Sequence, residues 1–451
     1  MQNHILLEKR ALALIDSLRQ RIIDPGLCLR HRKRPEDFSR ECRLTFPIMV
    51  MLLLQKSLKS LQARLHETVR QLTQAVDGGS LSAGAFTHAR AKLGASTFVE
   101  LNQQAVLPLV YGAQYPGLVE RWRGHRVLAI DSSVVRLPKS QEVAQKFGWM
   151  ECSQDAEQPQ ERYPQGRLSV LYDVSNQVAL EARLEPWRVA EEPIAHQHLD
   201  RVEAGDLVLT DRGYTSYLWL WDVVARGAHF VSRCSRRSFG VAQMLLQQDR
   251  AGVSVCGTLQ ASKEFKRECR KWGWPLEMKV RFVTVRLKTG ELEVLVTSLL
   301  DPELYPTQDF AELYWCRWGQ EIFYGRLKGR LDLENCSGLS VHAVEQDLAA
   351  TILLSNVERI ISGPAAAQLA ERTSQREQPT KINRALSLHA LKTRLLDLLA
   401  SALPAQKVLQ ELTQWFQDNP VSVRKNRKVP RNEFSAARSY HFQRYVRKLV
   451  F

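Results

Sequence analysis

Two aspartates are placed in the sequence where they could bind metal ions. Asp131 follows a short apolar run at residues 127–130, and Asp211 follows a second run at residues 206–210. Each run predicts a strand buried on both faces, and open α/β sheets bind ligands at the carboxyl ends of such strands. Carboxylates at that edge suit Mg²⁺. An aspartate after a strand can equally begin a turn or cap a helix, so the pair alone leaves both interpretations open.

A third acidic residue, Glu321, lies in a segment that predicts one continuous helix over residues 313–328. One face of this helix carries four polar residues at i, i+3, i+7 and i+14: Tyr314, Arg317, Glu321 and Lys328. Large apolar residues indicate that the helix is mostly buried: Trp315, Trp318, Ile322, Phe323 and Leu327. A polar stripe on a buried helix needs a specific partner, and a metal-bound phosphate flanked by cations would suit it. The alternative is a solvated face whose charges pair along the helix.

Phosphodiester cleavage is the chemistry that such residues would support. The negative oxygens of a phosphodiester repel nucleophiles, and two divalent ions about 4 Å apart relieve this repulsion. One ion activates the attacking water or hydroxyl, and the other stabilises the leaving oxygen. Carboxylates on rigid elements supply the oxygen ligands and the charge that these ions need.

The same residues carry a resemblance to a known family. The spacing Y-x2-R-x3-E-x6-K, met from Tyr314 to Lys328, resembles the signature of insertion-sequence-four family transposases. Three further segments are similar to that family: residues 86–93, 211–214 and 300–306. The resemblance covers roughly residues 30–360, and the four-residue signature is specific only as a combination.

This resemblance implies a ribonuclease-H-like α/β core with a β-strand insertion, flanked by helical amino- and carboxyl-terminal regions. It implies Asp131, Asp211 and Glu321 as catalytic ligands of Mg²⁺, with Mn²⁺ as a substitute. It also implies cut-and-paste transposition, in which a nick frees a 3′-hydroxyl that forms and later reopens a DNA hairpin. Residues expected to contact DNA near the scissile phosphate are Tyr314, Arg317, Lys328 and Arg212. Relatives stack a tryptophan of the insertion beside a flipped base, but Trp272 and Trp274 do not clearly match its position.

The elements that must position these residues follow from periodicity and turn signals. Residues 168–174 and 178–184 predict a hairpin, residues 190–202 and 218–226 predict helices, and residues 229–232 predict a strand. Residues 280–287 and 292–297 predict a second hairpin within a β-rich insertion. The resulting division has five parts: helical residues 1–120, core residues 121–235, the insertion at 236–305, core residues 306–362 and a basic helical region at 363–451.

The amino-terminal region contains a candidate DNA-reading helix. Ser82 is suited to begin a helix that ends at Gly94, and the break at residues 77–80 separates it from a preceding helix. This arrangement is compatible with helix-turn-helix docking, with Arg90 and Lys92 as DNA contacts. A plain helical bundle with a solvated basic face fits the same pattern.

Composition restricts the class of protein. Lys and Arg total 63 against 48 Asp and Glu, and the net charge of +15 favours a polyanionic partner. Nucleic acid is the commonest such partner, although a ribosome or membrane surface fits the charge too. No apolar run approaches the roughly 20 residues of a spanning helix, and the eight cysteines form no C-x-x-C pair. We therefore expect a soluble intracellular protein, and the resemblance implies a bacterial protein of the cytoplasm, associated with the nucleoid.

The predicted function is DNA transposition at terminal inverted repeats, followed by insertion into target DNA. Because two element ends must be held together, a homodimer on DNA is expected by analogy. Two alternatives stay open: a nuclease of the same fold that does not transfer strands, and an inactive transposase-derived DNA-binding protein.

Overall fold

The computed structural model describes residues 2–40, 42–56, 61–73, 81–151, 162–263, 265–287, 290–401 and 403–423. The chain forms two compact units. The first unit is drawn from Met1–Val119, Arg136–Gln165 and Gly325–Phe451, and the second from Glu120–Val135 and Gly166–Tyr324. Helices near the two ends of the chain thus share one unit, although the sequence suggested separate regions for them.

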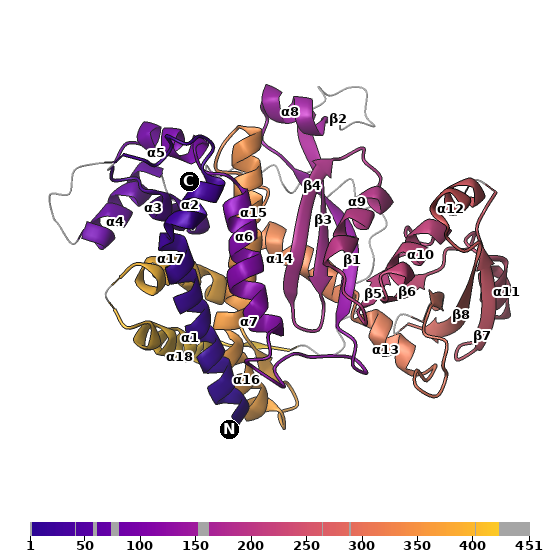
Figure 1. Cartoon of the computed structure of the whole chain (residues 1–451). Helices are drawn as coiled ribbons and strands as arrows, with labels where there is room; N and C mark the ends of the chain where they lie inside the picture. The colour runs from indigo at the N-terminus through magenta and orange to yellow at the C-terminus, as the bar shows by residue number, and fades with distance from the viewer. Residues whose placement is uncertain are drawn as a thin grey trace, which may run out of the picture. The chain divides into compact units, whose positions relative to one another are not determined.

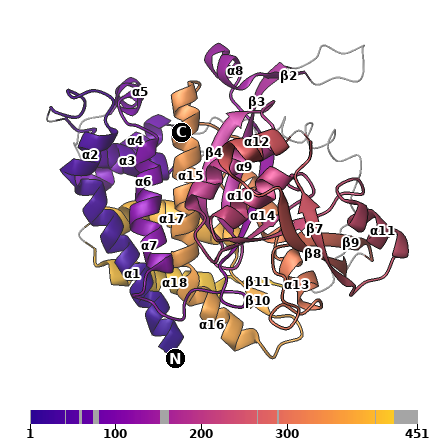
Figure 2. The same ribbon diagram turned by 45° about the vertical axis from the view of Figure 1, so that its right-hand side comes forward.

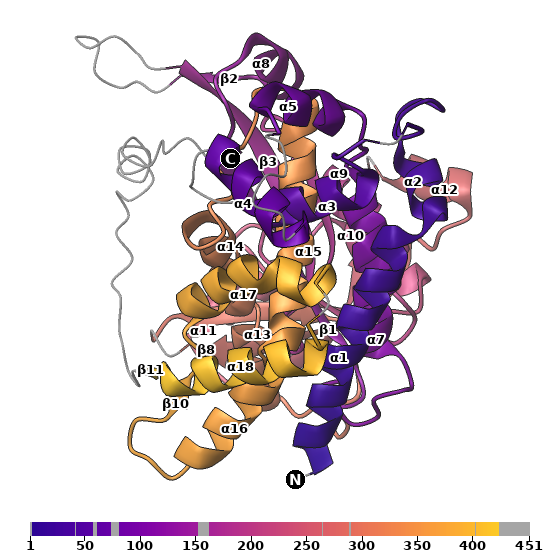
Figure 3. The ribbon, with the colours of Figure 1, turned by 90° about the vertical axis from the view of Figure 1, so that its left-hand side faces the viewer.

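The first unit is mainly helical. Its helices are α1 (Gln2–Ile23), α2 (Pro25–His31), α3 (Phe46–Leu54), α4 (Leu61–Thr73), α5 (Ala83–Ala91), α6 (Ser96–Leu101), the π-helical η1 (Asn102–Val106), α7 (Leu107–Tyr111), α8 (Gln141–Phe147), α15 (Val341–Ile361), α16 (Gly363–Thr373), α17 (Arg384–Leu399) and α18 (Ala405–Asp418). Helix α15 is buried along most of its length and packs against α3, α6 and α17. Figure 3 shows α17 and α18 side by side. Short strands β10 (Thr380–Lys381) and β11 (Val421–Ser422) pair antiparallel.

The predicted helix after Ser82 is confirmed as α5. The Ser82 hydroxyl accepts a hydrogen bond from the Ala85 amide, which is the expected N-cap interaction. The basic residues of the chain's last segment, among them Arg424 and Lys425, lie outside the described residues.

A mixed sheet organises the second unit, although its edge strand β2 and the first residues of β3 are grouped with the first unit. In the described part of the chain nine strands form it, in the order β2-β3-β1-β5-β6-β9-β8-β7, with β4 paired to β3. The strands are β1 (Val127–Arg136), β2 (Trp149–Glu151), β3 (Arg162–Asp173), β4 (Val178–Pro186), β5 (Leu207–Thr210), β6 (His229–Arg233), β7 (Ser254–Gln260), β8 (Glu277–Arg286) and β9 (Leu292–Thr297). Both predicted hairpins are confirmed as antiparallel pairs, β3 with β4 (Figure 1) and β8 with β9.

The register of the parallel strands brings the two aspartates together. Strand β1 pairs with β5 so that Ala129 lies opposite Leu209, and β5 pairs in parallel with β6. Asp131 and Asp211 are each two residues beyond that paired position, on neighbouring strands. The expectation that β1 ends before Asp131 was wrong. Pairing with β5 stops there, but β1 continues along β3 to Arg136.

The insertion between Asp211 and Glu321 is more helical than predicted. Strands β7, β8 and β9 are accompanied by α11 (Gly240–Gln248) and α12 (Lys266–Trp272), and Figure 2 shows α11 beside β9. Because β9 pairs antiparallel with β6, these strands extend the central sheet. The remaining helices are α9 (Glu191–His198), the 3₁₀ turn η2 (Leu199–Arg201), α10 (Tyr217–Ala225), α13 (Asp309–Trp315) and α14 (Trp318–Gly329).

The single helix predicted over residues 313–328 is two helices. Helix α13 stops at Trp315 and α14 begins at Trp318, and the amides of Arg317 and Gln320 bond to carbonyls three residues earlier. Ile322 is 66% exposed, whereas Phe323 and Leu327 are buried, so burial is less complete than predicted. Among the described helices none is long and apolar enough to cross a membrane.

Candidate active site

Each aspartate is oriented by the amide that follows it in the chain. The Ser132 amide donates to Asp131 Oδ1 at 2.8 Å, and the Arg212 amide donates to Asp211 Oδ1 at 2.7 Å. Both carboxylates therefore have one oxygen held by the backbone where the parallel pairing of β1 with β5 ends. This is the edge at which the sequence predicted them to meet.

The backbone at Asp131 is fixed from behind by two hydroxyl groups. Tyr324 donates to the Asp131 carbonyl at 2.8 Å, and Ser169 approaches the same oxygen at 3.4 Å. Ser169 is hydrogen bonded in turn to His198 Nε2, whose Nδ1 contacts Glu181. Because Ser169 and His198 are fully buried, this chain of contacts positions Asp131 and is closed to substrate.

Arg317 lies between two of the predicted catalytic carboxylates. Its Nη1 is 3.5 Å from Asp131 Oδ2, and its Nη2 donates to Glu321 Oε1 at 3.2 Å. The guanidinium is buried, and its Nε has no hydrogen-bond partner among the described residues. The tight turn between α13 and α14 places Arg317 so that it faces both acids.

The other residues predicted to contact DNA differ in their exposure and in their neighbours. Tyr314 is only 2% exposed and its hydroxyl donates to the Thr210 carbonyl at 3.3 Å, so it supports the end of β5. A direct phosphate contact by Tyr314 does not fit this placement. Arg212 is exposed beside Asp211. Lys328 belongs to the first unit, and its Nζ lies 3.9 Å from Glu334 Oε1.

A second arginine holds Asp211. Arg233 Nε lies 2.8 Å from Asp211 Oδ1, and Arg233 Nη1 donates to Glu293. Burial opposes ionisation of Asp211, but Arg233 and the Arg212 amide outweigh it and lower the pKa of this carboxyl below its ordinary value. Asp211 is therefore ionised across the physiological range of pH.

Glu191 is a further carboxylate at the site. Its Oε1 accepts hydrogen bonds from Ser132 Oγ, at 2.6 Å, and from Arg167 Nη1. A Cβ built on Gly213 would lie 3.6 Å from Glu191 Oε2. Glu191 Oε1 thus contacts Ser132, which follows Asp131, and Glu191 Oε2 faces Gly213, which lies two residues after Asp211.

Burial makes Asp131 difficult to ionise. It raises the pKa of this carboxyl to about 6, helped by the negative charges of Glu191 and Asp211 and opposed by the Ser132 amide and Arg317. The contrast with Asp211 shows that positive charge is insufficient on the Asp131 side of the site.

The donor set fits a hard divalent cation, although it is not assembled around one. Carboxylates outnumber guanidinium groups here: Asp131, Asp211, Glu191, Glu293 and Glu321 against Arg167, Arg233 and Arg317. An excess of carboxylate oxygens over cationic side chains suits Mg²⁺, which prefers hard oxygen ligands. In the part of the chain that the structure describes, however, no three acidic, histidine or cysteine side chains lie close enough to hold a metal. Arg317 separates Asp131 from Glu321.

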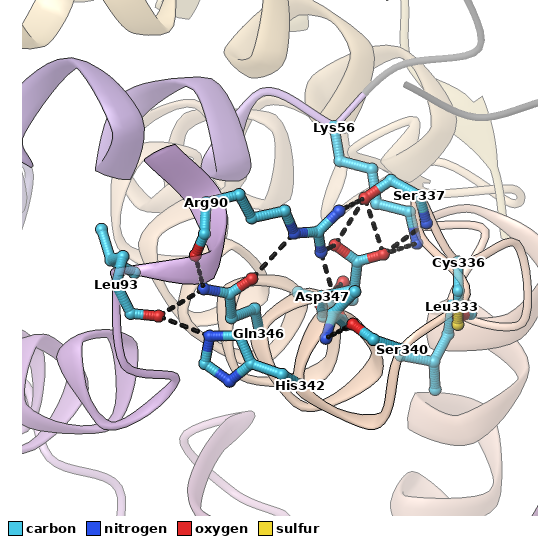
Figure 4. A network of polar contacts seen from close by, with 12 residues as sticks. Lys56, Arg90, Leu93, Leu333, Cys336, Ser337, Ser340, His342, Gln346 and Asp347 are labelled. Atoms are coloured by element: carbon cyan, nitrogen blue, oxygen red, sulfur yellow. Dashed lines mark hydrogen bonds and ion pairs between the residues drawn. The ribbon is translucent and has the colours of Figure 1, made fainter. Parts of the chain in front are cut away.

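Arg90 is not available for the DNA contact predicted from the sequence. It is only 5% exposed, and Figure 4 shows its guanidinium in a network with Gln346, Ser337 and Asp347. The sequence identified a basic helix but not which of its faces packs inward. Lys92, two residues later, is exposed as a DNA contact requires.

Sequence reasoning missed Glu191, Arg233 and Glu293. Glu191 begins a helix after a strand, a position that is ordinary for an acidic residue because of the helix dipole. Arg233 ends the strand next to β5, and Glu293 lies on β9, which pairs with β6. Only the sheet order, which local patterns do not contain, could have brought them to Asp211.

Comparison with known proteins identifies the family. The model of the transposase DDE domain matches residues 122–357, which is more than half of the chain. The chain belongs to the DDE transposase family. The matched part of this transposase includes Asp131, Asp211, Glu321 and Lys328, and it excludes helices α1 to α7.

Two curated relatives of the transposase come from Escherichia coli K12. It is 24% identical to the transposase InsG of insertion sequence element IS4 over 71% of its own length and 70% of the relative's. It is 28% identical to the putative transposase InsZ over 33% of its own length and 50% of the relative's. Among solved structures, a piggyBac transposase synaptic complex with hairpin DNA aligns with 95% of this chain and 88% of that one, at 12% identity and a TM-score of 0.40.

Proposed function

We propose that this protein catalyses cut-and-paste DNA transposition of an insertion sequence. A ribonuclease-H-like core would use Asp131, Asp211 and Glu321 as ligands of Mg²⁺, or of Mn²⁺ in its place. The observation that carries the proposal is the arrangement around Arg317: two of the three acids contact this arginine, and the third lies on the neighbouring strand. This arrangement lies within the residues that match the DDE transposase domain.

When bound, the metal ions would supply an activated nucleophile and charge stabilisation at the scissile phosphate. The residues of the chain do the rest. Arg317 would exchange its contacts with Asp131 and Glu321 for a phosphate oxygen, a ligand that its planar guanidinium suits. Arg212 and Lys328 would bind flanking phosphates. Glu191, through Ser132, would keep Asp131 in its position.

The substrates would be double-stranded DNA at the terminal inverted repeats and at the target. We further propose that the freed 3′-hydroxyl forms a hairpin with the opposite strand, and that two subunits hold two ends. A nuclease without strand transfer is the second candidate, because the same acids would serve hydrolysis alone.

The test is incubation of the full chain with Mg²⁺ and DNA that carries the ends of its element. Nicked ends, hairpins and joined products, separated on a denaturing gel, are expected from the wild type. Glu321→Gln removes a ligand charge with little change of shape, so cleavage should fall at least about a thousandfold while binding to the ends persists.

The products distinguish the candidates. Cleavage without joined strands would favour the nuclease, and joined products without hairpins would exclude only the hairpin step. Metal-dependent cleavage that persists in Glu321→Gln would overturn the assignment of the three acids. Glu312→Gln is a matched control, because Glu312 is exposed on α13 and should leave cleavage unchanged.

A further inference from the structure

We propose that a short basic segment directly after α2 and the exposed face of α5 together bind the phosphate backbone of duplex DNA. The basic strap is defined here as Arg32, Lys33 and Arg34, and with Lys92 it forms the strap surface. This inference rests on the proposed function for its DNA partner. It keeps Lys92, which the sequence predicted as a DNA contact, and replaces Arg90 with Arg32, Lys33 and Arg34, which sequence reasoning did not single out.

The basic strap is bonded to the end of α5 through backbone atoms. The Lys33 amide donates to the Lys92 carbonyl at 2.9 Å, and the Gly94 amide donates to the His31 carbonyl at 2.7 Å. Between these bonds, Arg32 and Leu93 form an antiparallel β-bridge. A Cβ on Gly94 would lie 2.9 Å from the His31 carbonyl oxygen, so only glycine permits this approach. Residues about 60 apart in sequence are thereby held in one register.

The charge of the strap surface is not matched by an ion pair in the described part of the chain. Lys33, Arg34 and Lys92 are exposed, and no ion pair found among the described residues includes any of them or Arg32. Arg30 differs, because it pairs with Glu100 at 2.5 Å. The nearest buried acid along the chain is Asp37. Its Oδ2 accepts a hydrogen bond from the Arg34 amide, not from a basic side chain of the strap surface. A row of uncompensated cations on a fixed backbone suits a polyanion with regularly spaced charges.

The exposed face of α5 has the shape that close approach to DNA requires. The exposed residues of α5 and its C-cap are Gly84, Ala85, Thr87, His88, Ala91 and Lys92, and the buried ones are Phe86, Ala89, Arg90 and the following Leu93. The outward side chains are small or polar, and none is a large apolar group that would seek a lipid or protein core. Such a face can enter a groove while the strap surface holds phosphates.

A buried network holds α5 in this orientation. Arg90 donates from Nε to Gln346, from Nη1 to Ser337, and from Nη2 to Asp347 and to the Ala343 carbonyl, at 2.7 to 2.8 Å. Gln346 Nε2 returns a bond to the Arg90 carbonyl, and Figure 4 shows these residues converging from α5, α15 and the segment before α15. All four residues in side-chain contact are buried.

The experiment measures binding of a duplex of arbitrary sequence by fluorescence anisotropy across a range of salt concentrations, without divalent metal. Phosphate contacts are independent of sequence and of catalysis, so failure of the proposed reaction would not affect the result. Lys33→Ala, Arg34→Ala and Lys92→Ala should each lower the slope of log K against log [salt] by about 1, and the triple variant by about 3.

Arg30→Ala is the matched control, because it removes a nearby cation that Glu100 already neutralises. Its salt slope should stay close to that of the wild type. A folded triple variant with an unchanged slope would overturn the proposal. So would a triple variant that keeps DNA affinity but no longer binds vesicles of phosphatidylserine and phosphatidylcholine, since that result would assign the surface to a membrane. Thermal unfolding of each variant verifies that the fold is intact.

Discussion

Two buried arginines in this transposase differ in how completely neighbouring groups satisfy their hydrogen bonds and their charge. Arg90, in the first unit, has every nitrogen of its guanidinium bonded to a neighbour, and it lowers the pKa of Asp347 although burial works to raise it. Arg317, in the second unit, lies at longer distances from Asp131 and Glu321, and its Nε has no partner in the described structure. Around it the pKa of Asp131 is raised.

The difference separates an anchor from a reaction centre. A buried ion pair holds elements together only when its hydrogen bonds are complete, because otherwise the cost of removing charge from water dominates. The Arg90 network meets that condition and fixes α5. The Arg317 cluster leaves negative charge uncompensated and a donor unused, which is typical of sites that await a ligand.

The largest effect is expected from breaking the anchor. Asp347→Ala leaves Arg90 buried without its anionic partner, and Ser337 loses the acceptor of its hydroxyl and amide. The free energy of unfolding should fall by about 3–5 kcal/mol, which chemical denaturation of the full chain would measure.

A second variant, Arg90→Ala, distinguishes an anchor from a DNA contact when both its unfolding and the salt dependence of its DNA binding are measured. Arg90→Ala should also destabilise the protein, but the molecules that remain folded should keep the salt slope of the wild type. A stable Arg90→Ala variant with a reduced slope would instead restore Arg90 as a phosphate contact.

A gain in stability is expected at the reaction centre. Asp131→Asn should abolish cleavage yet raise the free energy of unfolding by about 1–3 kcal/mol near pH 7.5 in the presence of a chelator. The pKa of Asp131 is raised from 3.8 to about 6 in the folded state. Its stabilising contribution is therefore complete below pH 3.8 and is lost as the pH rises through about 6.

The advantage of the Asn variant should accordingly be small near pH 4 and grow up to about pH 7. Addition of Mg²⁺ should stabilise the wild type more than the variant. A variant less stable than the wild type at every pH would show that Asp131 is instead satisfied by its neighbours.

The smallest effect is expected at Glu191. Glu191→Gln removes one negative charge and weakens the hold on Ser132, so the Mg²⁺ concentration for half-maximal cleavage should rise about tenfold. Binding of Mn²⁺, followed by electron paramagnetic resonance, should weaken in parallel. Glu192→Gln is the control: this neighbour bonds to Ser216 and leaves Ser132 untouched. Equal behaviour of the two variants would exclude a role for Glu191 at the metal site.

Local patterns predicted many elements correctly and failed where packing decides. The hairpins, the Ser82 cap and strand β5 follow from alternation and turn chemistry, which are properties of neighbouring residues. Strand β1 extends beyond Asp131 because β3 continues beside it, and no local signal reports that partner. Arg90 and Lys92 read alike in the sequence as basic residues of one helix, yet one is buried and the other exposed.

The sequence by itself determined the chemical inventory: two aspartates after apolar strands, the spacing from Tyr314 to Lys328, and an excess of basic residues. Residue type and spacing suffice for these, since each depends on positions close in the chain. The tertiary structure decided which charges meet. The order of the strands places Arg233 beside Asp211, and the turn before α14 places Arg317 between two acids. Helix α15 supplies Gln346, Asp347 and the Ala343 carbonyl, which accept hydrogen bonds from Arg90. Except for Arg317 with Glu321, which is an i,i+4 pair, these pairings join residues that are tens to hundreds of positions apart. Only packing of the whole chain determines which buried charges are neutralised and which remain available for a ligand.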